Sequence, residues 1–240
     1  MQKFVHCNQK YFAVRHSDAI ICVSENTKRD LLKYLPDIDS EKVYVIYNGI
    51  SEDFAPLADK HTSLMYPFES KNFLLFVGAR GGYKNFVKMV ECLNGTNENL
   101  IIVGGGELSE QEKQLLNSSI GSTHYKWVGR IENYELNQLY NQAKCLVYPS
   151  VYEGFGIPPV EAQKAGCPVI AMNSSSLPEV LGQSGILLNE LNAGKLNEVL
   201  HLLESSSVRD KYIMNGIKNS ERFSWDLTFK KTMEVYKMFM

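Results

Sequence analysis

The sequence has few cysteines, and none of them is placed to form a familiar pair. Five cysteines are spread over 240 residues, and no Cys-x-x-Cys spacing occurs. Cys22 and Cys145 lie inside apolar runs that are typical of strands. We therefore expect buried thiols in a reducing compartment rather than disulfides.

The sequence also has no large excess of positive or negative charge and no long apolar run. The formal net charge is -2, which gives no electrostatic reason to expect binding of nucleic acid or of an anionic membrane. Residues 1–15 contain no continuous apolar core of a signal peptide, and no apolar run approaches the length of a membrane span. We expect a cytoplasmic protein, with peripheral attachment at the inner face of the membrane as the alternative.

No metal-binding pattern is evident in the sequence. Asp37-Ile38-Asp39 has the D-x-D form that binds a metal in a different transferase architecture, but it follows Pro36 in a polar segment, where turn formation explains it. The histidines show no metal-ligand spacing; they are His6, His16, His61, His124 and His201. We therefore expect no metal site.

Two glycine-rich stretches fail the nucleotide-binding patterns that they resemble at first sight. Residues 78–85 read GARGGYKN, in which Tyr83 stands where a P-loop requires glycine and Asn85 where it requires Ser or Thr. Gly104–Gly106 lack the last glycine of a dinucleotide fingerprint, because Ser109 occupies that place. The second stretch is therefore interpreted as a tight turn between a strand and a helix.

What the sequence does contain is a regular alternation of short apolar runs and helical patterns after residue 72. Apolar runs typical of strands precede or follow each helical pattern, which predicts βαβ units and a parallel sheet covered on both faces. The predicted helices are 85–93, 107–117, 133–142, 158–164, 193–203, 208–223 and 225–240. Ligands of such sheets bind at the carboxyl ends of the strands, near helix N-termini.

The first fifty residues carry weaker signals of the same kind. Residues 2–16 have the pattern of an amphipathic helix, with Phe4, Tyr11, Phe12 and Val14 as its apolar positions. A short buried strand is predicted over 19–24 and a second strand over 42–50. Ser24 or Asn26 is suited to cap the helix between them.

One stretch, YPSVYEGFGIPPVEAQKAGCPVIA from Tyr148 to Ala171, combines an apolar strand, a glycine turn and a proline-initiated helix. The glycines leave backbone N–H groups bare, and Pro158 suits the first helical turn. Bare N–H groups at a helix N-terminus form an anion site, here for a phosphate or diphosphate. Glu161 in the first turn could accept hydrogen bonds from two sugar hydroxyls, and Glu153 would point into the same cleft. Taken singly, each glutamate is better explained by an ordinary structural role, Glu161 as a charge at a helix N-terminus and Glu153 as a solvated loop residue.

The stretch resembles the E-x7-E signature of the group 1 retaining glycosyltransferases, which reads E-G-F-G-x-P-x-x-E-A. The matching positions are Glu153, Gly154, Phe155, Gly156, Pro158, Glu161 and Ala162. Similarity extends over about residues 10–238, through DAIICVSENTKRDLL, VIYNGI, FVGARGGYKNF, AGCPVIAMNSSSLPEVLGQSGILL and FSWDLTFKKTMEVY. The resemblance implies a hexosyl or related glycosyltransferase with two facing Rossmann-like domains, the GT-B architecture.

The resemblance also implies roles for individual residues. Glu161 would hold the ribose hydroxyls, Glu153 would lie beside the donor sugar, and Lys84 would neutralise the diphosphate. Arg80 is the candidate second cation, although the family's arginine directly follows the glycine that matches Gly78, where this chain has Ala79. The remaining predicted donor-binding residues are Gly154, Phe155, Gly156, Ile157, Gly78, Arg130, Ile131, Leu177 and Glu179. By position alone, Lys84 and Arg130 are also consistent with ordinary surface residues.

The family's two-domain plan gives this chain a predicted organisation. Residues 1–50 would be the end of the N-terminal domain and its crossover, and 51–72 a linker. Residues 73–222 would be the Rossmann-like domain that binds the nucleotide sugar, and 223–240 the closing helix. The acceptor half would come from a missing N-terminal domain or a partner chain. The closing helix would then expose an apolar patch and favour self-association.

Three functions are consistent with these patterns. The first is the donor half of a retaining glycosyltransferase, which passes a sugar from a nucleotide diphosphate to a sugar or lipid-linked acceptor in surface glycan synthesis. The second is a non-catalytic nucleotide-sugar-binding module that acts with a partner chain. The third is another GT-B enzyme, such as an epimerase or a phosphorylase, which the unbroken Glu153-to-Glu161 motif disfavours. None is expected to need a metal or cofactor for the transfer itself, apart from the pyridoxal phosphate of a phosphorylase.

Overall fold

The structure is a computed structural model that describes residues 2–58 and 67–240, with side chains from residue 9 onward. Its contacts divide the chain into two compact units, Met1–Gly49 with Phe223–Met240, and Ile50–Arg222. The predicted linker over 51–72 lies partly outside the described residues. Each unit is described by itself below.

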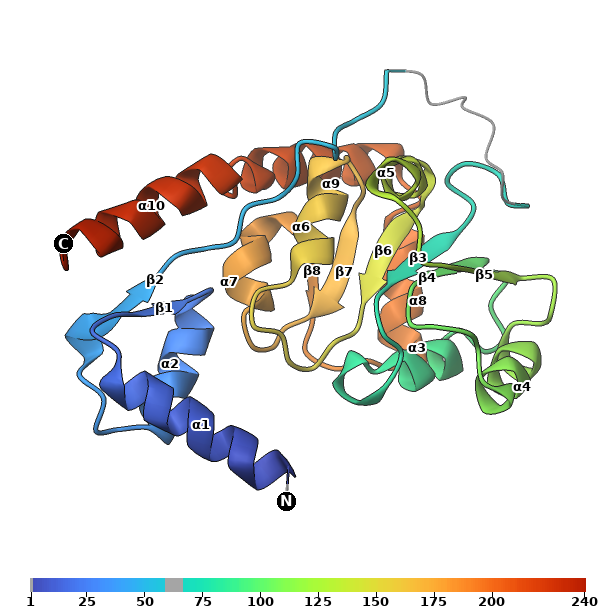
Figure 1. Cartoon of the computed structure of the whole chain (residues 1–240). Helices are drawn as coiled ribbons and strands as arrows, with labels where there is room; N and C mark the ends of the chain where they lie inside the picture. The colour runs from blue at the N-terminus through green and yellow to red at the C-terminus, as the bar shows by residue number, and fades with distance from the viewer. Residues whose placement is uncertain (1, 59–66) are drawn as a thin grey trace. The chain divides into compact units, whose positions relative to one another are not determined.

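The larger unit is built on a six-stranded sheet in which all strands are parallel (Figure 1). The strand order is β5-β4-β3-β6-β7-β8, so the chain first extends the sheet in one direction and then returns to extend it in the other. The strands are β3 (Leu74–Val77), β4 (Leu100–Val103), β5 (Tyr125–Gly129), β6 (Cys145–Tyr148), β7 (Val169–Met172) and β8 (Ile186–Leu188). This is the order of a doubly wound Rossmann-like sheet.

Helices cover both faces of this sheet, as the alternating pattern predicts. Helix α3 contacts α4 and α8 on one face, and α6 contacts α5, α7 and α9 on the other (Figure 1). The helices are α3 (Phe86–Cys92), α4 (Glu110–Ser119), α5 (Asn133–Gln142), α6 (Ile157–Lys164), α7 (Leu177–Leu181), α8 (Ala193–Leu202) and α9 (Ser206–Ser220), with the 3-10 turns η2 (Gly82–Lys84) and η3 (Gly182–Ser184). Because both faces are covered, every residue of β3, β4, β6 and β7 is buried.

The smaller unit has a two-stranded parallel sheet, β1 (Ile20–Cys22) with β2 (Val43–Val45). Its core is a cluster of Cys22, Ile38 and Val43, against which Val14 and Leu31 pack. Ser24 begins helix α2 and accepts a hydrogen bond from the Thr27 amide at 3.0 Å, which confirms the predicted cap. The unit's other elements are α1 (Gln2–His16), α2 (Glu25–Tyr34), η1 (Ser40–Lys42) and α10 (Trp225–Lys237).

All helices and strands predicted within the described residues are present. Some of them begin or end at other residues than predicted, and some of their side chains differ from the prediction in burial. Two details are wrong. Tyr11 and Phe12, predicted as apolar positions of an amphipathic helix over 2–16, are 40% and 63% exposed, and Ile21 of the predicted buried strand is 39% exposed. A two-stranded sheet has few partners with which to cover both of its faces, so Ile21 stays at the surface. Phe4 and Cys7 lie outside the described side chains, while Cys22 and Cys145 are buried free thiols as predicted.

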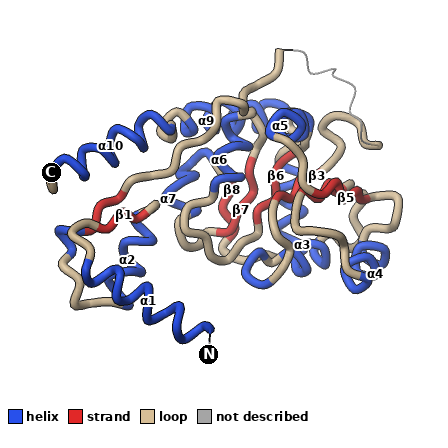
Figure 2. The backbone as a smooth tube through the Cα atoms, in the orientation of Figure 1, coloured by secondary structure: helices blue, strands red, loops and turns tan. Residues whose placement is uncertain are grey.

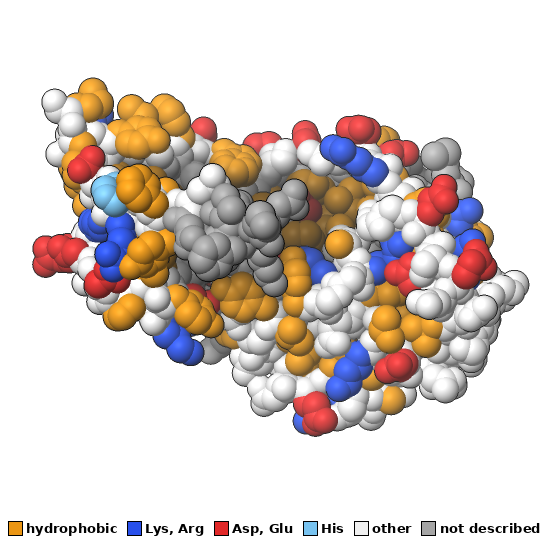
Figure 3. Space-filling view, turned by 60° about the horizontal axis from the view of Figure 1, so that its bottom comes forward, with side chains coloured by type: hydrophobic (Ala, Val, Ile, Leu, Met, Phe, Trp, Pro, Cys, Tyr) orange, Lys and Arg blue, Asp and Glu red, His pale blue; other side chains and the backbone are white. Residues whose placement is uncertain are grey.

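The surface carries both signs of charge. On the face drawn in Figure 3, Lys and Arg side chains alternate with Asp and Glu side chains among exposed hydrophobic groups. Within the described part of the chain, no helix is long and apolar enough to span a bilayer. The same residues contain no group of three His, Cys, Asp or Glu side chains that could hold a metal ion.

Candidate functional site

The candidate site lies where the strand order of the larger sheet reverses. Strands β3 and β6 are neighbours there, and the connections that follow them lead to opposite faces of the sheet. The loops after these two strands are drawn in tan in Figure 2. The Val151 amide, after β6, donates to the Tyr83 carbonyl, after β3, at 2.9 Å and joins the two loops. In doubly wound sheets, ligands usually bind at the carboxyl ends of the strands where the strand order reverses.

Each of the two loops supplies one member of an ion pair. Lys84 ends the 3-10 turn η2 after β3, and its Nζ lies 2.6 Å from the Glu153 Oε1 in the loop after β6. The side chains are 13% and 12% exposed, so the pair is largely shielded from water. Lys84 Nζ also donates to the Tyr148 hydroxyl at 2.9 Å. Burial, followed by the charge of Glu153, raises the pKa of Tyr148, which keeps this hydroxyl neutral.

The glycine turn leads into helix α6 as its residue types require. Gly156 is the N-cap with φ +106°, a left-handed conformation that other residues rarely adopt. A Cβ at this position would lie 3.0 Å from Leu177 Cδ2, so the buried leucine would have to shift to make room for it. Pro158 and Pro159 follow Ile157 in the first turn of the helix, where no intrahelical N–H bond is lost. The N-terminus of α6 therefore faces the loop with its positive dipole end.

Serines in the loop after β7 hold this glycine turn. Ser175 Oγ accepts a hydrogen bond from the Glu153 amide at 2.8 Å. Ser176 is fully buried, and its hydroxyl lies 2.9 Å from the carbonyl oxygens of both Glu153 and Phe155. Ser175 has φ +51°, so the serine loop is itself held in an uncommon conformation. Strand β7 thus fixes the backbone that presents Glu153.

Glu161 lies on α6 beside a buried tyrosine of α5. The Tyr140 hydroxyl donates to Glu161 Oε2 at 3.1 Å. Burial raises the pKa of Glu161 to about 7, and the hydrogen bond from Tyr140 opposes this shift only in part. The carboxyl group therefore changes charge near neutral pH, and in its ionised form it can accept hydrogen bonds from a diol.

Arg80 lies apart from Lys84 and Glu153. Its guanidinium is bound to Glu112 at 2.7 Å and to carbonyl oxygens of the turn after β4. Gly78, at the end of β3, has φ +131° and donates from its amide to the Val103 carbonyl. The structure therefore brings Lys84 and Glu153 together and gives Arg80 a different set of partners. The role of Arg80 as a second cation beside the diphosphate stays a prediction.

The other predicted donor-binding residues differ in exposure. Arg130 is exposed and Ile131 partly buried, both directly after β5. Ile157 is 37% exposed at the start of α6. Leu177 is fully buried and packs on Gly156, so its side chain shapes the glycine turn. Glu179 is partly buried in the first turn of α7.

Sequence reasoning missed four residues that support the site, Tyr140, Tyr148, Ser175 and Ser176. The tyrosines lie in an ordinary helix and an ordinary apolar strand, where nothing in the pattern marks their hydroxyls. The run of serines at 174–176 was a usable signal, because consecutive hydroxyls before a helix commonly bind loop backbone.

Comparison with protein families identifies two matching regions. The profile described as "Glycosyl transferases group 1" matches residues 66–219. A second profile, "Glycosyltransferase Family 4", matches residues 6–54. The first region includes the sheet of the larger unit and the whole candidate site.

Curated relatives match the chain over most of its length. An uncharacterized glycosyltransferase of Methanocaldococcus jannaschii is 29% identical over 230 residues, which are 94% of this chain and 61% of the relative. The O-antigen chain mannosyltransferase B of Escherichia coli is 24% identical over 230 residues, covering 91% of this chain and 60% of the relative. The chain thus spans about three fifths of the length of these relatives.

Solved structures share the fold at lower identity. The sucrose-phosphate synthase of Thermosynechococcus elongatus superposes with a TM-score of 0.81 at 23% identity, over 94% of this chain and 59% of that one. HepE of Anabaena, solved in complex with UDP and glucose, gives 0.78 at 19% identity, over 94% and 64%. These similarities confirm the predicted Rossmann-like fold of the GT-B glycosyltransferases. With the family match over 66–219, they lead to one conclusion: the chain belongs to the group 1 glycosyltransferase family.

Proposed function

We propose that this chain supplies the donor-binding half of a retaining glycosyltransferase. The donor is a nucleotide-diphosphate sugar, and the acceptor is a sugar or a lipid-linked glycan that the remainder of the enzyme binds. Residues 73–222 form the donor domain, 1–50 the end of the acceptor domain with its crossover, 51–72 the linker and 223–240 the closing helix. The acceptor half comes from a preceding domain or a partner chain.

One observation supports this proposal most directly. At the point where the strand order reverses, the Lys84 ammonium and the N-terminus of α6 both belong to the loops that border one crevice. A departing diphosphate gains negative charge in the transition state, and fixed positive groups stabilise that charge. The proposal assigns this role to Lys84 and the backbone of Gly154–Gly156, without a metal ion.

The other site residues take complementary roles in the proposal. Glu161 accepts hydrogen bonds from the two ribose hydroxyls, for which its ionised carboxylate is suited. Glu153 lies beside the donor sugar and orients Lys84. The bond from the sugar to phosphate breaks through an oxocarbenium-like state, and the acceptor attacks from the face that the diphosphate leaves. The configuration at the sugar carbon is therefore retained.

The relatives suggest the biological setting. Two curated relatives are named O-antigen chain mannosyltransferases, one from Escherichia coli and one from Salmonella typhimurium. We extend this setting to the present chain as synthesis of a cell-surface polysaccharide. The proposal places the chain in the cytoplasm or at the inner face of the membrane.

A thermal-shift measurement with UDP, GDP and ADP, each with and without its sugar, tests the donor site. One nucleotide should raise the unfolding midpoint, because a ligand that binds only the folded state stabilises it. Glu161→Ala and Lys84→Ala should reduce that rise, and Glu161→Ala should weaken donor binding by ~1–3 kcal/mol. A full-size shift in both variants would contradict the assignment of the site.

The second candidate is a non-catalytic nucleotide-sugar-binding module that acts with a partner chain. It is favoured by one structural neighbour, the GtfA/B complex, in which two different chains associate. Both candidates predict nucleotide binding. Transfer of a radiolabelled sugar from the nucleotide found above, by this chain combined with an acceptor domain, separates the two candidates, because the module binds the donor without turnover.

A further inference from the structure

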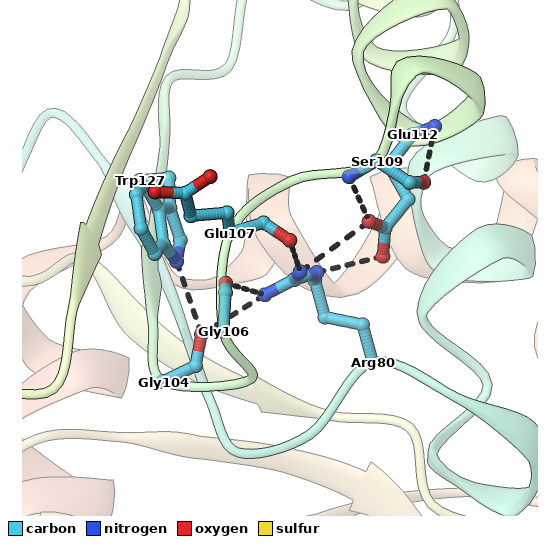
Figure 4. Close-up of polar contacts among 7 residues, drawn as sticks. All are labelled: Arg80, Gly104, Gly106, Glu107, Ser109, Glu112 and Trp127. Carbon is cyan, nitrogen blue, oxygen red and sulfur yellow. Dashed lines mark hydrogen bonds and ion pairs between the residues drawn. The ribbon is translucent and has the colours of Figure 1, made fainter.

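Arg80 is buried, 7% exposed, and every one of its guanidinium N–H groups meets an acceptor (Figure 4). Nε and Nη2 contact the two carboxylate oxygens of Glu112 at 2.7 and 3.3 Å. Nη1 donates to the carbonyls of Gly104 and Gly106 at 2.9 and 3.1 Å, and Nη2 donates to that of Glu107 at 2.8 Å. A guanidinium has five N–H donors, so none is left for a ligand in this arrangement.

The turn that Arg80 binds has an unusual backbone. Gly104, Gly105 and Gly106 follow β4 with φ values of +84°, +76° and +71°. Glycine adopts these left-handed values readily, and the carbonyl groups of Gly104, Gly106 and Glu107 are bound by Arg80. The guanidinium also fills the space beside the turn, because a Cβ on Gly105 would lie 2.5 Å from Arg80 Nη1 and 3.0 Å from the Gly78 carbonyl oxygen.

Glu112 holds the guanidinium from the other side. It is the third residue of α4, and its carboxylate closes a capping box by accepting from the Ser109 amide at 2.8 Å (Figure 4). Burial alone would raise the pKa of Glu112, but hydrogen bonds from Arg80 and Ser109 lower it, so the carboxylate stays charged. Arg80 therefore joins the loop after β3, the glycine turn and the start of α4 into one network.

The glycine turn lies between two segments of the proposed donor site. Strand β4 is flanked by β3, which leads to Lys84, and by β5, which leads to Arg130 and Ile131. The Gly104 amide donates to the Gly129 carbonyl at 2.6 Å, and Trp127 Nε1 donates to the Gly104 carbonyl at 3.1 Å. The turn is thus bonded to the end of β5 on one side and to Arg80 on the other.

We propose that Arg80 is a positioning residue, which fixes the Gly104–Glu107 turn as part of the surface that receives the nucleoside of the donor. This inference rests on the proposed donor site. Arg80 acts through the turn and does not contact the diphosphate. Its planar fork is required, because a lysine ammonium keeps the charge but cannot bridge a carboxylate and three carbonyls at once.

Binding of a nucleoside, compared with binding of its 5′-diphosphate, distinguishes a positioning role of Arg80 from direct contact between Arg80 and the phosphates. Dissociation constants are measured for the wild-type chain and Arg80→Lys, with a nucleoside and its 5′-diphosphate, below the unfolding midpoint of both proteins. The nucleoside is that of the nucleotide that stabilises the wild type. If Arg80 is a positioning residue, Arg80→Lys should raise the dissociation constants of both ligands by the same factor. We expect this factor to be about 10-fold, which corresponds to the loss of about one hydrogen bond.

Two further variants keep the test independent of the folding of Arg80→Lys. Gly105→Ala leaves every charge in place but displaces the guanidinium and strains the turn. It should therefore raise the dissociation constants of the nucleoside and of its diphosphate by one common factor. Arg209→Lys, on α9, is the matched control and should leave both constants unchanged.

Three results would overturn the inference. Loss of diphosphate affinity with unchanged nucleoside affinity would mean that Arg80 contacts the phosphates. A lowered unfolding midpoint with unchanged dissociation constants would mean a structural role only. A wild-type chain that binds no nucleoside diphosphate would instead refute the proposed donor site itself, and this inference with it.

Discussion

Glu161 carries the clearest pH signature among the site residues. Its pKa is raised to about 7 by burial, above the ordinary value of 4.5. A carboxyl group with a raised folded-state pKa binds more protons in the folded than in the unfolded state between these two values. Its contribution to stability is therefore complete below about pH 4.5 and is lost as the pH rises through about 7.

The replacement Glu161→Gln should remove this dependence. The wild-type free energy of unfolding should fall by up to about 3 kcal/mol more than that of Glu161→Gln between pH 4.5 and 7. Urea unfolding of both proteins at several pH values measures the difference. Parallel curves would show that Glu161 titrates at its ordinary pKa and is not desolvated as the structure has it.

The Lys84–Glu153 pair predicts opposite effects on stability and on nucleotide binding. Glu153→Gln leaves the largely buried ammonium without a counter-charge, which should destabilise the chain by about 1–3 kcal/mol. It should also tighten nucleoside diphosphate binding by about 10-fold. In the variant the diphosphate supplies the only negative charge beside the Lys84 ammonium, whereas in the wild type it competes with the Glu153 carboxylate. Denaturant unfolding and isothermal titration give the two quantities.

A comparable ion pair at the other end of the sheet provides the control. Lys144 Nζ lies 2.5 Å from Glu98 Oε1, and the side chains are 11% and 17% exposed. Glu98→Gln should cost less stability than Glu153→Gln, because Glu204 Oε1 remains 3.8 Å from Lys144 Nζ, and it should leave nucleotide affinity unchanged. Equal effects of Glu153→Gln and Glu98→Gln on nucleotide affinity would argue against Lys84 as the diphosphate residue.

At the scale of elements, the N-terminus of α6 depends on one glycine. Gly156→Ala places a Cβ at φ +106° and 3.0 Å from Leu177, which should destabilise the chain by about 1–3 kcal/mol. Gly194→Ala is the matched control, because that position in α8 is exposed, has no left-handed φ and leaves room for a methyl group. It should change stability by less than about 1 kcal/mol, or increase it.

Calorimetric unfolding of both glycine variants, with and without the nucleotide, checks this prediction. The nucleotide should stabilise Gly194→Ala as it stabilises the wild type, and Gly156→Ala less. An unperturbed Gly156→Ala would mean that the turn has another conformation from the one described.

Elements could be predicted from sequence where short-range chemistry decides them. The predicted range of helix α5 agrees with the observed range, Asn133–Gln142, at both ends. Its hydrophobic period and its flanking strands fix where the helix begins and ends. The strands β3, β4, β6 and β7 are continuous apolar runs, as buried parallel strands must be. Helix α7 was missed, because its five residues lie inside a segment of turn-forming residues.

The whole molecule offers a prediction about association. Helix α10 exposes Trp225, Phe229 and Tyr236 to 53%, 68% and 56%, at spacings that place them along one side of the helix. Exposed apolar stripes of this kind favour association. The purified chain should therefore self-associate with rising concentration, and Phe229→Ser with Tyr236→Ser should reduce this.

Sedimentation velocity over a range of concentrations measures the association. Met214→Ser, on α9, removes an apolar side chain that is 66% exposed but not part of the α10 stripe, and it should leave the association unchanged. A chain that stays monomeric at every concentration would refute the predicted association.

Sequence by itself determined the family, the alternation of strands and helices, and the residues of the glycine turn with its two glutamates, because these follow from patterns over a few to a few tens of residues. Only the tertiary structure decided which of the candidates meet. It paired Lys84 with Glu153 across 69 positions of sequence and turned Arg80 toward Glu112 and the glycine turn. Such partners are set by the order in which strands assemble into a sheet, and this order places distant loops side by side without leaving a local mark on either one.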